Sequence, residues 1–409
     1  MTEIRINEPT ETQFQQVLNN IPNDLSNKDI NDFIIFNVNE LNPIDTREHL
    51  DTTYDFIKYG SNNLLPNELI KLMLECPTHK SIIDRKADFV LGQGIKFNNP
   101  QMFQWQLDIN NRNGLDDLVH DLALDYFLFG GFCNQVIWNQ DPHNLIVMNI
   151  IYQKFEQVRK GFSEDIDGNA YDQDLKISLD WKDRWKFIPQ SYDYYDKDIT
   201  YPPTEPVFQY YYDNSKGRLW YPNPSYISGI KSIQTEIELI NFVYNFVFQS
   251  FNPCGVLYIP WTLSPEQKLE FMKTLQTNSK GTNNAGKILA LFGNSDITQK
   301  IEFIPFNDNI SKINITSLYD TCSQQIIEAH MLPSRSVIGL PGETSLTGDA
   351  DTIKISNYIF EQSIINKARR IIKRELDKII INAGFNTLDW DIVPFNFDAV
   401  LSNKNSSII

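Results

Sequence analysis

One short segment has the residue spacing of a phosphate-binding loop. Gly281 to Lys287 reads Gly-Thr-Asn-Asn-Ala-Gly-Lys. Such a loop needs a Ser or Thr hydroxyl directly after its lysine to hold Mg²⁺, and here Ile288 follows instead. A phosphate-binding loop also leads from a strand into a helix, whereas this segment is predicted to lead from a helix into a strand. We therefore interpret it as a turn without nucleotide chemistry.

A second segment resembles part of a calcium-binding loop, because Asp165 and Asp167 alternate ahead of Gly168. In that register the twelfth position is Asp174, where a longer, bidentate Glu is needed. An Asp-Gly pair is also a strong signal for a tight turn between antiparallel strands. We expect a hairpin here, and a calcium-binding interaction module stays a third hypothesis.

Acidic and aromatic side chains are concentrated between residues 163 and 214. These 52 residues contain twelve acidic and five basic side chains, eight Tyr and two Trp. Carboxylates among aromatic rings are typical of carbohydrate clefts, where two carboxylates share the acid and base work. No spacing selects such a pair. An acidic carbohydrate-active enzyme or glycan-binding protein is the alternative hypothesis.

Neither the histidines nor the cysteines form a catalytic or metal-binding pattern. The five histidines are scattered without an HExxH motif, and no GxSxG or Cys–His signature occurs. The four cysteines lie far apart without a CxxC pair, so reduced thiols are expected rather than disulfides or a zinc cluster. We expect no enzyme activity, no catalytic residues, no metal and no cofactor.

The chain is acidic: 52 acidic against 36 basic side chains among 409 residues give a formal net charge of −16. A length of this order corresponds to two or three domains. The charge argues against a protein that grips nucleic acid through many phosphates or docks on an anionic membrane. No signal peptide is recognisable, and the uncharged stretch from Leu239 to Pro265 contains Asn and Pro residues. We expect a soluble, intracellular protein without a membrane span.

Hydrophobic periodicity and turn residues predict an α+β fold. Helices are predicted on both sides of Pro77, over 115–129, 226–251 and 315–332, and over about thirty residues that end at Ala383. Strands are predicted over 132–138, 145–152 and 390–397, and short antiparallel strands within 163–214. Between them lies a β-α-β unit, with strands over 255–260, 287–292 and 301–306 and a helix from the capping box at Ser264 to Thr277.

The last long helix is basic within an acidic chain. Residues 354–378 hold seven basic and three acidic side chains. One interpretation is a solvated helix face, because cations are favourable near helix C-termini. The other is a patch that faces a neighbouring subunit or phosphates. Its candidate residues are Lys367, Arg369, Arg370, Lys373 and Arg374.

Several short segments occur in a specific order between residues 54 and 395. The first are Tyr59-Gly60, Leu65-Pro66, Cys76-Pro77-Thr78-His79, Ile82-Ile83, Gly92-Gln93-Gly94 and Phe129-Gly130-Gly131. Then follow Asn252 to Leu257, Leu263 to Gln267, Asn284 to Lys287 and Ile327 to Pro333. Together they resemble the portal protein of tailed bacteriophages, the head-to-tail connector of long-tailed phages. The chain departs from the family in lacking a proline near Asn366, and residues 1–50 and 163–214 match nothing in it.

The resemblance implies a portal fold, with an α/β wing, two long stem helices, a small β-α-β clip, a tunnel loop, a long C-terminal helix and a reduced or absent crown. In family order these are an N-terminal arm (1–53), wing (54–224), first stem helix (225–252), clip (253–310), second stem helix (311–336), tunnel loop (337–350), long wing helix (351–384) and a C-terminal strand and tail (385–409).

The resemblance also implies a homo-oligomeric ring, usually a dodecamer, at one capsid vertex of the virion, assembled in the host cytoplasm. Double-stranded DNA passes transiently through the channel of such a ring during packaging and ejection. The implied partners are the large terminase, head-tail connector or adaptor proteins, the major capsid protein and scaffolding proteins. The implied tunnel-loop residues are Gly342, Glu343, Thr344, Ser345, Leu346, Thr347 and Gly348, and the implied clip contacts are Trp261, Gln267, Lys280, Asn283 and Asn284.

The net charge is compatible with this role. A wall rich in Lys and Arg would hold the passing duplex through released counterions. An acidic channel would instead repel phosphates and let DNA slide. The charge therefore excludes a tight grip on DNA and allows its passage.

Overall fold

The computed structural model describes residues 48–164, 170–213, 220–248, 255–261, 289–295, 302–305, 315–339 and 350–396. Helices and mostly antiparallel sheets occur together in these residues, so the predicted mixture of helix and sheet is confirmed. The chain divides into two compact units. We call residues 42–238 and 316–409 the main unit, and residues 1–41 and 239–315 the small unit.

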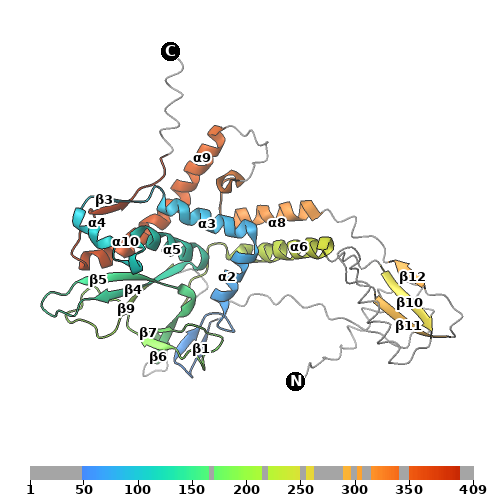
Figure 1. Ribbon diagram of the computed structural model, residues 1–409, viewed down its shortest axis with the longest axis horizontal. Coiled ribbons are helices and arrows are strands. Elements are labelled where there is room, and N and C mark those ends of the chain that lie inside the picture. Colours follow the sequence, from blue (N-terminus) through green and yellow to red (C-terminus); the bar gives the residue numbers. More distant parts are fainter. Residues whose placement is uncertain are drawn as a thin grey trace, which may run out of the picture. The chain divides into compact units, whose positions relative to one another are not determined.

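Four helices occupy the first third of the described chain (Figure 1). They are α2 (Leu65–Glu75), α3 (Pro77–Leu91), α4 (Pro100–Gln106) and α5 (Gly114–Phe129). Each of the first three has a proline in its first turn, where the missing N–H removes no helical hydrogen bond. Helix α5 ends at Gly130, whose φ of 88° is a left-handed conformation that glycine adopts without strain. The chain can therefore turn there directly into a strand.

The strands of the main unit form three antiparallel arrangements. A five-stranded sheet has the order β1 (His49–Asp51), β2 (Phe56–Lys58), β6 (Val158–Glu164), β7 (Ala170–Ile177), β8 (Gln190–Tyr192). A three-stranded sheet has the order β5 (Val147–Gln153), β4 (Gly131–Trp138), β9 (Val207–Tyr212). Strand β3 (Ile95–Phe97) pairs with β13 (Trp390–Ile392). The antiparallel strands predicted within 163–214 are thus confirmed. Strands β6 and β7 pair up to Glu164 and Ala170, on either side of residues 165–169, as in the predicted hairpin.

The core of the main unit is built around α5, which packs on α3 and on β4. Helix α10 (Asn366–Asn382) packs on both α3 and α5. Its buried apolar residues recur at helical spacing, and they are Ala368, Ile371, Ile372, Leu376, Ile379 and Ile380. The helix ends with Ala383 as its C-cap, followed by Gly384 at a φ of 90°, so the predicted end of the long helix is confirmed.

The described part of the small unit contains a three-stranded sheet of order β11 (Leu289–Ser295), β10 (Gly255–Trp261), β12 (Glu302–Pro305). Strand β10 is parallel to β11 and antiparallel to β12. The register between β10 and β11 shifts between Ile259 and Trp261, where Pro260 has no N–H to donate. Parallel neighbours need a long crossover connection. The three predicted strands are confirmed, while the predicted helix over 264–277 lies outside the described residues.

The loop between β7 and β8 is held by one buried and one paired side chain. The Trp181 indole N–H donates to the Gln157 carbonyl at 3.0 Å, and Arg184 pairs with the buried Asp51 at 2.6 Å. The pKa of Asp51 is lowered, because the bonds to Arg184 and to a backbone N–H outweigh its burial. The same loop leaves the side chain of Trp185 85 % exposed.

We predict opposite outcomes for the two tryptophans of this loop. Trp181→Ala should lower the free energy of unfolding by about 3–5 kcal/mol, because it removes a buried aromatic ring. The matched change Trp185→Ala should alter it by less than about 0.5 kcal/mol, because its ring is in solvent. Urea denaturation followed by circular dichroism measures both, and equal losses would contradict the packing described.

Candidate functional site

The start of α6 (Ile230–Phe248) and the end of α8 (Ile315–Ala329) lie side by side in the main unit (Figure 1). A Cβ atom built on Gly229, just before α6, would come within 2.6 Å of the Ala329 methyl carbon, at the end of α8. Farther along, Ser232 Oγ donates to Gln325 Oε1 at 2.7 Å. Rising numbers in α6 therefore meet falling numbers in α8, so the pair is antiparallel. Only glycine permits this close approach at position 229.

A buried glutamate of α6 holds the start of α3. Glu236 Oε1 accepts a hydrogen bond from the Thr78 backbone N–H at 3.3 Å and from Cys76 Sγ at 3.4 Å. Thr78 lies in the first turn of α3, where free N–H groups and the helix dipole favour a carboxylate. Burial raises the pKa of Cys76 to about 12, so its thiol keeps the proton that it donates.

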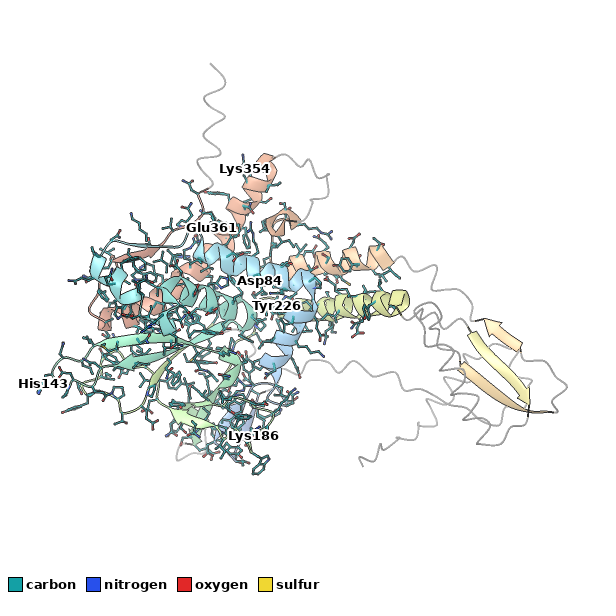
Figure 2. The ribbon with its side chains drawn as sticks, in the orientation of Figure 1. Asp84, His143, Lys186, Tyr226, Lys354 and Glu361 are labelled. Atoms are coloured by element: carbon teal, nitrogen blue, oxygen red, sulfur yellow. The ribbon has the colours of Figure 1, made fainter. Side chains whose placement is uncertain are left out.

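Three basic side chains lie buried in a row where α3 meets the end of α8, and we call Lys86, His330 and His79 the basic row. Lys86 Nζ is 3.1 Å from His330 Nδ1, and His330 Nε2 is 2.9 Å from His79 Nδ1. All three side chains are at most 1 % exposed. The ring of Tyr226, labelled near the start of α6 in Figure 2, packs on both imidazoles at centroid distances of 4.5 and 4.8 Å.

The positively charged form of each member of the basic row is disfavoured. Burial lowers the pKa of Lys86 to about 7. Burial, and then the charge of Lys86, lower the pKa of His79 to about 3 and that of His330 well below its ordinary value. Among the residues that the structure describes, no carboxylate forms an ion pair with Lys86, and burial is the cause of its shift. A second proton in the row would therefore have no counter-ion.

Sequence reasoning missed the basic row, because it treated the histidines as scattered. Two signals were present. His79 and Lys86 are seven residues apart, which puts them on one face of a helix. His79 and His330 also each lie within a segment that resembles the portal family. Neither signal shows that the two segments meet in space.

The described side chains of α6 change from buried at Ile237 to exposed at Tyr244. Ile230, Ile233 and Ile237 are buried. Tyr244, seven residues after Ile237 on the same helix face, is 57 % exposed, next to Val243 at 39 %. Phe242 is also exposed, so three consecutive large apolar side chains meet solvent in this protomer. Such a group is typical of a protein-contact surface.

Three of the five basic candidates form an exposed stripe on α10. Lys367, Arg370 and Arg374 are exposed and lie three and four residues apart, so they share one helix face. Lys367 pairs with Asp213 at 3.4 Å, and Arg374 pairs with Glu375 at 2.8 Å. Exposed pairs of this kind contribute little to stability. The stripe is therefore accessible and partly neutralised.

The other two basic candidates have internal roles. Arg369 was a candidate for a patch that faces a neighbouring subunit or phosphates, but it is buried, because its guanidinium donates to two carbonyls at the end of α3 and to Glu361 at 2.6 Å. Lys373 is half-buried, lies 4.7 Å from the Trp390 ring centre and pairs with Asp377 at 3.1 Å. The sequence pattern placed all five basic candidates in one patch. In the structure, contact with α3 buries Arg369 and leaves Lys367, Arg370 and Arg374 exposed.

A π-helix, Glu361–Ile365, joins α9 (Ala350–Phe360) to α10. It ends just before Asn366, where the resemblance led us to expect a proline that is missing. A π-helix widens one turn and interrupts the regular hydrogen-bond ladder, as a proline would. Figure 2 labels Glu361 at this junction. Burial raises the pKa of Glu361, and Arg369 acts against the shift.

Part of the aromatic and acidic segment 163–214 faces the interior. Lys160, which is buried, donates to Asp172 at 2.6 Å and lies 4.2 Å from the Tyr212 ring centre. The Tyr194 hydroxyl donates to the same carboxylate at 2.6 Å. Burial and Asp172 raise the pKa of Tyr194, which stays protonated. These side chains enclose a lysine of this chain, so they are not available to line a sugar-binding cleft.

Several predicted site residues lie outside the described residues. They are Gly342 to Gly348 of the tunnel loop and Gln267, Lys280, Asn283 and Asn284 of the clip, together with the segment Gly281 to Lys287. Trp261 is the last residue of β10, of which the backbone is described. Their roles stay predictions.

The described residues contain neither a cluster of metal-ligating side chains nor a helix that could span a membrane. Within them, no group of three or more His, Cys, Asp or Glu side chains could hold a metal ion. No helix in the described ranges combines the length and the apolar character needed to cross a bilayer. Cys76, Cys133 and Cys322 are buried free thiols.

Comparison with known proteins finds similarity in structure alone. No family model matches the sequence, and no curated protein matches it. A chain in the neck of a native gene transfer agent (GTA) particle, computed with C12 symmetry, has a TM-score of 0.52 and 12 % identity over 88 % of this chain and 90 % of that chain.

A chain in the virion of the native GTA particle has a TM-score of 0.51 and 12 % identity over 83 % of this chain and 87 % of that chain. An HK97 family phage portal protein from Corynebacterium diphtheriae has a TM-score of 0.45 and 11 % identity over 81 % of this chain and 97 % of that chain. The two GTA matches show a shared fold, and the predicted resemblance is confirmed at that level.

We predict that the neighbouring arginines of α10 differ strongly in their effect on stability. Arg369→Met should lower the free energy of unfolding by about 3–5 kcal/mol, because it leaves the buried Glu361 carboxylate without its partner. Arg370→Met, an exposed control on the same helix, should change it by less than about 0.5 kcal/mol. Thermal and urea unfolding measure both. A mild effect of Arg369→Met would show that its guanidinium is not held as described.

Proposed function

We propose that this chain is a portal protein, one subunit of a dodecameric ring at a capsid vertex through which double-stranded DNA is packaged and ejected. The observation that carries the proposal is the fold shared with a chain in the neck of a GTA particle, over 88 % of this chain and 90 % of that chain. The neck structures were computed with C12 and C6 symmetry, which supports a ring of identical subunits.

Each region of the chain then has a role in the ring. Residues 54–224 form the wing, 225–252 and 311–336 the two stem helices, 253–310 the clip, 337–350 the tunnel loop and 351–384 the long wing helix. The start of α6 and the end of α8 pack antiparallel, which supports their assignment as the two stem helices. The parallel pairing of β10 with β11 supports a β-α-β clip, because it needs a crossover connection.

The exposed apolar group on α6 gives the subunit contact. Phe242, Val243 and Tyr244 meet solvent in one protomer. Contact with the next subunit of the ring would remove them from water, at a gain of about 25 cal/mol per Å² of apolar surface. Closed symmetry repeats the same contact at every subunit, so a modest surface suffices for a stable ring.

The charges of the chain fit DNA as a passing partner. A net charge of −16 disfavours long-lived phosphate contacts and favours sliding. The exposed stripe of Lys367, Arg370 and Arg374 then faces an acidic surface of the neighbouring subunit. Residues Gly342 to Gly348 contact the DNA as the tunnel loop.

The remaining partners follow from the same role. Trp261, Gln267, Lys280, Asn283 and Asn284 of the clip would contact the large terminase and later the head-tail connector, and the wing would contact capsid and scaffolding proteins. The chain itself needs no catalytic residue, metal or cofactor, because ATP hydrolysis belongs to the terminase. The protein is expected in the virion, and in the host cytoplasm during assembly.

Electron microscopy of the purified protein tests this proposal. We expect closed rings, most of them twelve-fold, with a central channel. Class averages count the subunits directly. Monomers or dimers under every assembly condition would overturn the proposed function.

A charge placed in the apolar group of α6 should separate folding from assembly. Val243→Asp should abolish rings and leave the melting temperature of the protomer unchanged within about 2 °C, because Val243 is exposed there. The control Thr235→Asp adds the same charge at an exposed polar position of α6 and should keep the rings. Size-exclusion chromatography and microscopy give the result. Rings formed by Val243→Asp would rule out this surface as the subunit contact.

A further inference from the structure

The basic row can order its hydrogen bonds in two directions. A charged Lys86 can only donate, so His330 Nδ1 accepts, and His330 Nε2–H donates to His79 Nδ1. The last hydrogen then lies on His79 Nε2, a buried atom without a hydrogen-bond partner. A neutral Lys86 can accept, and every hydrogen in the row reverses, which leaves His79 Nε2 as a bare acceptor. The two distances, 3.1 and 2.9 Å, suit both directions.

Among the described residues, no carboxylate is bonded to the basic row or shifts the pKa of its members. From the segment before α6, Tyr226 covers both imidazoles, and its hydroxyl donates to the Leu128 carbonyl at 2.8 Å. From α5, the Phe127 ring centre lies 5.2 Å from Lys86 Nζ. From α6, Glu236 faces the start of α3, where its Oε1 is bound by Thr78 N and Cys76 Sγ. Burial and the charge of Glu236 raise the pKa of Tyr319 and that of Cys322, both on α8. Neither side chain is bonded to the row.

The row joins α3 to the residue that follows α8. Lys86 and His79 belong to α3, which is packed against α5 in the centre of the core. His330 follows α8 directly, because that helix ends at Ala329. With Lys86 charged, an extra proton on His330 would place two positive charges about 3 Å apart, and an extra proton on His79 would add a second positive charge to the same row. In a site that excludes water, either charge strongly disfavours the packed state. Moving the end of α8 away from α3 relieves that repulsion.

We propose that the basic row is a protonation switch for the contact between the end of α8 and α3: the end of α8 is docked on α3 while His79 and His330 are neutral, and it detaches when either histidine takes up a proton. The switch lies within one protomer. It goes beyond the proposed role in a ring and does not depend on it.

The direction of the pH effect follows from the shifts. A histidine exposed by opening has an ordinary pKa of about 6.5, whereas the pKa of His79 in the docked state is about 3. At a pH between these two pKa values the histidine takes up a proton when α8 opens. The open fraction therefore rises as the pH falls below about 6.5. Between pH 7.5 and pH 5, one histidine should raise the opening equilibrium by about 30-fold. Lys86 acts at higher pH: its pKa of about 7 makes docking still more favourable above neutrality.

Hydrogen exchange on the full chain tests the switch, with rates corrected for the intrinsic effect of pH. Amide protection in the last turns of α8 and through His330 should fall by about 30-fold or more from pH 7.5 to pH 5. Protection of β4 and β9 should not change, which separates local opening from global unfolding. Constant protection of α8 over this range, or an equal loss in β4 and β9, would overturn the proposal.

Three variants identify the groups responsible. His330→Gln keeps a donor and an acceptor without a titrating ring and should reduce the pH response of α8 by at least 10-fold. Should it fail to fold, Lys86→Met provides the test, because removing the lysine charge lets a docked histidine accept a proton and so weakens the response. The control His120→Gln changes a partly exposed histidine that lies beside Asp88 on α3 and should keep the full response. A full response in either His330→Gln or Lys86→Met, or its loss in His120→Gln, would refute the switch.

Discussion

The attachment of α6 and α8 depends on buried polar contacts with α3. Glu236 of α6 accepts a hydrogen bond from the first turn of α3. His330, at the end of α8, bonds to His79 and Lys86, which also belong to α3. Apolar packing alone tolerates sliding and rotation, whereas a hydrogen bond to a buried group loses most of its value when the partner moves by one ångström. These contacts lie at the start of α6 and at the end of α8, where they fix the two helices to α3.

Three of the buried cations of the main unit, Arg369, Lys160 and Lys86, differ in how their charge is balanced. Arg369 has Glu361, and Lys160 has Asp172 together with an aromatic ring. Breaking such a pair is costly because the remaining charge has no water to replace its partner. Lys86 has two neutral histidines in place of a carboxylate, and its pKa falls to about 7. Two of these sites are therefore suited to rigidity, and the third is suited to change.

Local elements were predictable to a useful degree. Prolines in first turns, glycines after helices and alternating strands gave correct types for α3, α5, α10 and the strands β4 and β10, because these signals act between residues close in sequence. The last predicted strand, 390–397, is shorter: it ends at Ile392, ahead of Pro394, which cannot donate to a ladder. The interruption before Asn366 could not be predicted, because a π-helix has no single marker residue.

Residue order alone therefore accounts for the α+β class, the acidic charge and most helix ends, since each arises from composition or from neighbours a few residues away. Contacts between distant segments account for the rest. Arg369 and Arg370 are adjacent and chemically identical, and only the place of α3 makes one a buried brace and the other a surface residue. His79 and His330 are 251 residues apart, and their meeting depends on the packing of α3 against α8. Burial is a property of the whole fold, and burial makes those imidazoles a candidate switch.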